Sequence, residues 1–117
     1  MRTLSLLVVT LFALGAVPLA ADARSDAKKQ MEFGIEVAQR GLWREAIYRW
    51  ERAAQIDPTY AAAHNNLAIA WEHEGELPKA RAAYEQAIEL EPNNTFIKQN
   101  YELFKEINDR TTRQDTQ

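Results

Sequence analysis

Residues of matching type recur in this chain at a spacing of 34 positions. Six pairs share this offset: Gly34 with Ala68, Gly41 with Gly75, Ala46 with Ala80, Trp50 with Tyr84, Ala53 with Ala87, and Pro58 with Pro92. A fixed period of this length indicates a structural unit that is repeated along the chain and stacked on its neighbour. We therefore expect a repeat architecture.

The apolar residues inside each unit follow the spacing of helix faces. The i, i+3, i+4 pattern runs through residues 46–54, 60–71 and 77–88. Gly41 and Gly75 fall where one helix has to stop and the chain has to turn. Pro58 and Pro92 disfavour helix at the residue before them, so each marks the end of a second helix. No segment shows strand alternation, and the predicted fold class is all-α.

A period of 34 with small residues, aromatic residues and a closing proline resembles the tetratricopeptide repeat. The resemblance implies two antiparallel helices, A and B, in each repeat. It places the first repeat at about 27–60 and the second at about 61–94, which together form a short right-handed α-solenoid. Trp50 and Trp71 fall at core positions of that pattern, and Trp43 is expected to pack across the turn at the start of the first B helix.

A third helix is predicted at about 95–108, behind the capping side chains of Asn93, Asn94 and Thr95. It has Glu102 where the repeat has its small residue, so we interpret it as a capping helix that covers the second repeat. The domain is thus expected to span 24–109. The last residues, 110–117, have no apolar side chain and are predicted to be disordered.

The first 23 residues have the pattern of a secretory signal peptide. Arg2 precedes an uncharged run over 4–17, and small residues at Ala21 and Ala23 suit cleavage before Arg24. The alternative is an uncleaved membrane anchor, although the run is short for a spanning helix. We expect export, to the periplasm or the outside, and membrane contact only if the segment is not cleaved.

The resemblance also implies where a partner protein or peptide would bind, because the A helices of such repeats line a concave groove. The groove positions carried over to this chain are Lys28, Met31, Ile35, Gln39, Asn65, Asn66, Ile69, Glu72, His73 and Gln99. Met31, Ile35 and Ala38 share one helix face. A terminal helix with two apolar faces needs two burial partners, so self-association of the chain is the alternative hypothesis.

One subfamily grips the C-terminal carboxylate of chaperones with a clamp of Lys, Asn and Arg side chains. Asn66 matches one clamp position. Met31 and Ile35 occupy the first-helix positions, and Phe96 and Asn100 occupy those of the third helix. Without the positive charges a carboxylate is poorly held, so this role is rejected.

Other classes of function have little support in the sequence. The formal net charge is −3 and basic residues are not clustered, which argues against nucleic acid. The chain has no cysteine, and its two histidines, His64 and His73, fall on opposite sides of a helix. No phosphate-binding glycine loop occurs. We expect no catalytic residues, no metal and no cofactor.

Overall fold

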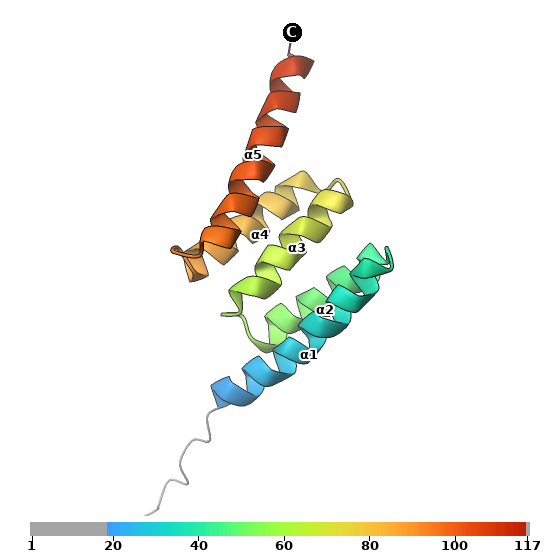
Figure 1. Cartoon of the computed structure of the whole chain (residues 1–117), viewed down its shortest axis with the longest axis vertical. Coiled ribbons are helices and arrows are strands. Elements are labelled where there is room, and N and C mark those ends of the chain that lie inside the picture. The colour runs from blue at the N-terminus through green and yellow to red at the C-terminus, as the bar shows by residue number, and fades with distance from the viewer. Residues whose placement is uncertain (1–18, 117) are drawn as a thin grey trace, which may run out of the picture.

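The computed structural model of the chain describes residues 19–116 (Figure 1). Five helices follow one another: α1 (Leu19–Gln39), α2 (Trp43–Ile56), α3 (Ala61–His73), α4 (Leu77–Leu90) and α5 (Thr95–Asp115). Helix α1 packs on α2, α3 packs on α4, α2 joins the two pairs through α3, and α5 covers α4. The prediction of an all-α fold is confirmed for the described residues, which contain no strand.

The predicted signal peptide, residues 1–23, lies largely outside the described residues. Only 19–23 of that span are described, as the first turns of α1, so this helix begins ahead of the expected repeat start at residue 27. Residues 19–33 contain no proline or glycine, so nothing in this stretch breaks the helix ahead of residue 27. In the part of the chain that the structure describes, no helix is long and apolar enough to cross a membrane.

The same turn closes both helical pairs. Gly41 and Gly75 have φ angles of +78° and +73°, in the left-handed region that glycine enters without the steric cost of a Cβ. The Leu42 N–H donates to the Val37 carbonyl oxygen at 3.0 Å, and the equivalent bond of the second pair measures 2.9 Å. These bonds satisfy carbonyl groups at the end of the first helix while the chain reverses direction, as the glycine spacing predicts.

Helices α1 and α2 approach each other closely at Gly34. A Cβ placed on Gly34 would lie 2.3 Å from Trp50 Nε1, too close for any real contact. The indole is buried, and its Nε1 donates to the Met31 carbonyl oxygen at 3.2 Å. At the matching position of the second pair, Ala68 packs in one cluster with Tyr84. The larger Trp50 ring is therefore paired with the hydrogen atom of Gly34, and the smaller Tyr84 ring is paired with the methyl group of Ala68.

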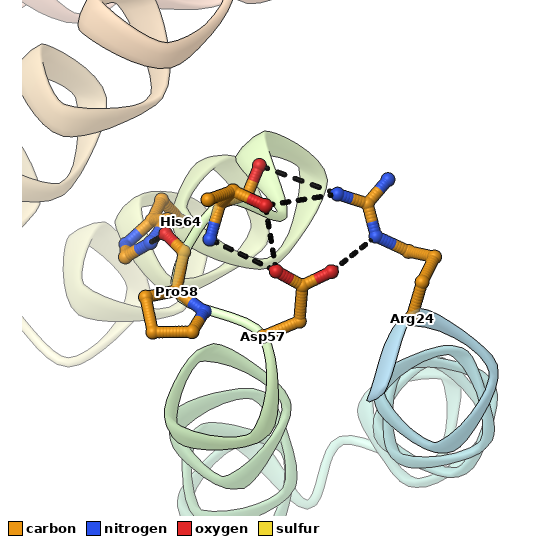
Figure 2. A network of polar contacts seen from close by, with 5 residues as sticks. Arg24, Asp57, Pro58 and His64 are labelled. Carbon is orange, nitrogen blue, oxygen red and sulfur yellow. Dashed lines mark hydrogen bonds and ion pairs between the residues drawn. The ribbon is translucent and has the colours of Figure 1, made fainter. Parts of the chain in front are cut away.

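A polar network ties the start of α1 to the turn between the two helical pairs (Figure 2). Arg24 Nε donates to Asp57 Oδ2 at 2.5 Å, and the N–H and hydroxyl of Thr59 donate to Asp57 Oδ1 at 3.0 and 2.7 Å. Burial raises the pKa of Asp57, but the bonds from Thr59 and Arg24 outweigh it and hold the pKa below its ordinary value of 3.8. The Arg24 guanidinium also lies 4.5 Å from the centre of the Tyr60 ring.

Helix α5 closes the far end of the stack. The Asn94 side chain accepts a hydrogen bond from the Ile97 N–H at 3.1 Å, which caps the helix. Ile97 and Phe104 are buried against the second pair. The rings of Phe104 and Tyr101 lie 5.4 and 5.6 Å from that of Tyr84, so aromatic contacts fasten the cap to α4.

The outer face of α5 is polar. Glu102 is exposed and accepts a hydrogen bond from Lys105 Nζ at 2.8 Å, and Lys98 beside them is also exposed. A further B helix would need a small residue at position 102 and an apolar face around it. The interpretation of this segment as a capping helix is confirmed.

The tail differs from its prediction. Disorder was expected from Arg110, but α5 continues to Asp115, so the prediction is wrong for 110–115. Arg110 forms an ion pair with Glu106 one turn earlier, and the Thr112 hydroxyl donates to the Asn108 carbonyl oxygen at 3.1 Å. No proline or glycine stands between 95 and 117, so the helix has no local reason to end at residue 108.

The close approach at Gly34 predicts a coupled effect of two substitutions. Gly34→Ala should lower the free energy of unfolding by about 1–3 kcal/mol, because the new methyl group overlaps the Trp50 indole. Adding Trp50→Tyr reproduces the pairing of the second repeat. The double variant should lose less stability than the sum of the two single variants, as measured by urea unfolding. Strict additivity would contradict this account.

The network around Asp57 predicts a dependence of stability on pH. Because the folded pKa is lowered, its contribution is complete above the unfolded pKa and is lost as the pH falls through the folded pKa. Asp57→Asn should therefore lower the free energy of unfolding by about 1–2 kcal/mol at neutral pH, with the difference closing in acid. The exposed Asp26→Asn serves as control. A pH-independent difference between wild type and Asp57→Asn would count against the ion pair.

Candidate functional site

The first helices of the two pairs and the capping helix together line a groove. One hollow of about 460 Å³ lies among α1, α3 and the start of α5, and a second of about 330 Å³ continues between α1 and α3. The first is lined by Lys28, Met31, Glu32, Ile35, Tyr60, Ala62, Asn65, Asn66, Asn94, Phe96 and Ile97, and the second by Ile35, Ala38, Gln39, Trp43, Trp50, Asn66 and Ile69. Ile35 and Asn66 line both hollows, so they form one continuous surface, here called the A-helix groove.

An apolar row begins in this surface and continues onto α5, where its last member lies outside both hollows. Ile35, Ile69 and Leu103 stand at the same offset of 34, one on each of α1, α3 and α5. Ile35 and Leu103 are 41% and 57% exposed, and Ile69 is half-buried. Because the repeats stack in register, a single position of the repeat becomes a line of apolar side chains across three helices.

The polar part of the groove consists mostly of amides. Asn65 is 2% exposed, and its Oδ1 accepts a hydrogen bond from Asn100 Nδ2 at 3.1 Å, which links α3 to α5. Asn66 lies beside it on the groove surface. Among the lining residues only Lys28 and Glu32 carry a formal charge. The groove therefore offers shape, apolar surface and amide hydrogen-bonding groups, and almost no net charge.

Most of the residues predicted from the sequence meet in this groove. Seven of the ten line one or both hollows: Lys28, Met31, Ile35, Gln39, Asn65, Asn66 and Ile69. Met31 is only 5% exposed and belongs to the core of the first pair, so it forms part of the groove floor. The expected apolar face of Met31, Ile35 and Ala38 is correspondingly reduced, because its first member is already buried.

Three predicted residues lie outside both hollows. Glu72 accepts a hydrogen bond from the Tyr84 hydroxyl at 3.3 Å. Burial raises the pKa of the Glu72 carboxyl, and the bond from Tyr84 only partly offsets this. His73 stacks on Trp43, with ring centres 3.8 Å apart and planes at 13°. Gln99 is exposed on α5. Glu72 thus has its partner on the other helix of its own pair, and His73 has its partner in the first pair.

Sequence reasoning did not place Glu32, Tyr60 and Asn94 in the groove. Glu32 stands at the same repeat position as Asn66, so the offset of 34 was a usable sign. Tyr60 and Asn94 come from the turns before α3 and α5. Their contribution depends on how the turns fold back over the groove, which periodicity does not reveal.

The described residues do not form a metal site. No group of three His, Asp or Glu side chains among them could hold an ion. His64 Nε2 lies 3.1 Å from the Pro58 carbonyl oxygen, as Figure 2 shows, while His73 stacks on Trp43. Each histidine thus has a partner of its own, and the two serve separate parts of the structure.

The bond between Asn65 and Asn100 predicts how the groove is held together. Asn100→Ala removes the donor from the buried Asn65 amide and should lower the free energy of unfolding by about 1–2 kcal/mol. Its exposed neighbour provides the control, since Gln99→Ala should change stability by less than about 0.5 kcal/mol. Thermal or urea unfolding measures both. Equal effects of the two variants would show that the amide pair does not couple α3 to α5.

Comparison with known families accounts for the period of 34. Residues 61–94 match the family described as "Tetratricopeptide repeat", and residues 36–72 match that described as "TPR repeat". The two matches together cover residues 36–94, which include all of α2, α3 and α4.

Several known proteins are similar to part of this chain. The chloroplastic tetratricopeptide repeat domain-containing protein PYG7 of Arabidopsis thaliana is 30% identical over 73 residues, which is 62% of this chain and 24% of that protein. The type IV pilus assembly protein PilF of Pseudomonas aeruginosa is 30% identical over 86 residues, 72% of this chain and 34% of that protein. Protein O-mannosyl-transferase TMTC4 of Mus musculus is 31% identical over 64 residues, 55% of this chain and 9% of that protein. The chain thus spans about a third or less of the length of each relative.

Proposed function

We propose that this chain, which belongs to the tetratricopeptide-repeat family, is an exported adaptor that binds a protein or peptide partner in its A-helix groove. Repeats of this family are modules of protein–protein interaction. The groove, the export and the character of the partner are our proposals, and each has its own support.

The continuous A-helix groove carries the proposal. It combines exposed apolar side chains, Ile35 and Phe96, with amide side chains such as Asn66. Contiguous apolar surface bordered by polar groups is typical of contact sites. Because the groove has only Lys28 and Glu32 as charged lining residues, the proposed partner contributes apolar side chains and few charges.

Export is supported by the N-terminal sequence. Residues 1–23 combine a basic start, an uncharged run and small residues before Arg24. The match to a type IV pilus assembly protein supports a partner that belongs to a larger protein assembly. The alternative is a membrane-anchored scaffold that keeps the N-terminal segment. Mass spectrometry of the native protein distinguishes the two, since cleavage leaves Arg24 as the first residue and an anchor leaves Met1.

A catalytic role is not proposed. The family's repeats act as scaffolds, and the described residues form no site with the donors of a metal centre. The relative that is named as a transferase matches over only 9% of its length, so that match gives no support for transferase chemistry in this chain. The function that the groove supports is therefore the binding of a partner.

A charge placed in the apolar row tests the proposal. Ile35→Glu combined with Ile69→Glu should reduce the captured partner at least tenfold in a pull-down from envelope extract, because the row would then bury two carboxylates. Leu42→Glu combined with Tyr48→Glu adds the same charge to exposed apolar positions outside the groove and should leave capture unchanged.

Circular dichroism confirms that both double variants are folded. If the groove variant is folded and captures the same partners in the same amounts as wild type, the groove is not the binding site.

A further inference from the structure

A hollow beside the second helices of the two pairs is separate from the groove. It measures about 350 Å³, lies between α2, the end of α3 and the start of α4, and shares none of its described lining residues with the A-helix groove. Ile47, which is buried, and Trp71, which is half-buried, give it apolar surface. A hollow of this size admits one long side chain of another molecule. It is called the α2–α4 hollow below.

The positively charged side chains of the α2–α4 hollow are already engaged. Arg44 Nε lies 3.6 Å from Glu74 Oε2, which joins α2 to the end of α3. Lys79 Nζ lies 4.5 Å from the centre of the Trp71 ring, whose face attracts a cation. Each of the two positive groups therefore has a partner within the hollow itself.

Two carboxylates of the hollow are not engaged. Glu51 on α2 and Glu76, the residue before α4, line the hollow from different elements, and both side chains are exposed. Neither carboxylate forms a hydrogen bond or an ion pair with another of the described residues. The charge that is left unmatched in the α2–α4 hollow is therefore entirely negative, and it is complementary to a cation.

The corresponding positions of the next repeat differ. Arg110 stands 34 residues after Glu76, so a positive charge replaces the negative one. Glu85, the counterpart of Glu51 at the same offset, accepts a hydrogen bond from the Tyr101 hydroxyl at 2.9 Å. The pair of unengaged carboxylates is thus a feature of the α2–α4 hollow and not a general product of the repeat.

We propose that the α2–α4 hollow binds an arginine side chain of a partner protein, whose guanidinium pairs with the carboxylates of Glu51 and Glu76. A guanidinium is planar, carries five N–H donors and can pair with two carboxylates, whereas a lysine ammonium is a compact point charge. The apolar stem of an arginine suits the surface of Ile47 and Trp71. Because this site is separate from the A-helix groove, it goes beyond the proposed function and lets the chain hold a second segment.

The indole N–H of Trp71 in NMR spectra of the full chain reports binding directly. A tripeptide of alanine, arginine and alanine, blocked at both ends, should shift this signal with a dissociation constant on the order of 1–10 mM, because one exposed ion-paired side chain gives weak affinity. The Trp50 indole N–H, which is buried and donates to the Met31 carbonyl oxygen, should not move.

The same tripeptide with norleucine in place of arginine keeps the apolar stem and should bind at least about tenfold more weakly. Equal responses of the Trp71 signal to the two peptides would overturn the proposal. So would the absence of any response, or tighter binding of the tripeptide that has glutamate at its centre.

Two double variants test the carboxylates. Glu51→Gln combined with Glu76→Gln should raise the dissociation constant of the arginine tripeptide at least about fivefold, because the hollow loses both acceptors of the guanidinium. Glu36→Gln combined with Glu89→Gln removes the same charge from exposed positions that do not line the hollow, and it should change the constant less than about twofold. Equal weakening by the two variants would show a response to net charge alone and would overturn the site. Neither variant alters the A-helix groove, so failure of this site and failure of the groove are separately visible.

Discussion

The structure depends on how closely the two helices of each pair approach each other. Gly34 offers only a hydrogen atom to the Trp50 indole, and Ala68 offers a methyl group in the cluster that contains the Tyr84 ring. This small-against-large pairing sets the separation within a pair, and the repeat of the same separation keeps the pairs in register. The row of Ile35, Ile69 and Leu103 is aligned because this constraint is met twice, so the proposed binding surface follows from the packing.

The two ends of the stack are finished in different ways. Leu67 and Tyr101 occupy one repeat position and pack against the preceding pair, whereas Phe33, at the same position in α1, has no preceding pair and is 42% exposed. The Arg49 guanidinium covers its ring at 4.2 Å. At the other end α5 presents a charged face around Glu102. A cation on an aromatic ring and a polar helix face each replace a missing neighbour.

The period allowed most of the fold to be predicted, because each structural role demands a residue type. Glycine is needed where φ is positive, a small residue where helices touch, and proline where a helix ends. The length of α5 was missed because composition alone does not register the ion pair between Glu106 and Arg110. The stacking of Trp43 on His73 and the bond from Arg24 to Asp57 were also missed, since both join segments whose relative placement only the folded repeats determine.

The apolar row also constrains the geometry of a partner. Packed helices lie about 8–10 Å apart, so a ligand that crosses the A helices meets an apolar contact at about that interval. A helical ligand presents residues i and i+7 about 10.5 Å apart on one side, close to this interval. An extended strand presents same-side residues about 7 Å apart, so beyond the first contact its side chains no longer match the spacing of the row. For the partner that we propose, this spacing favours an amphipathic helix that lies across the A helices, and the charges of Lys28 and Glu32 at one end of the groove are placed to influence its direction.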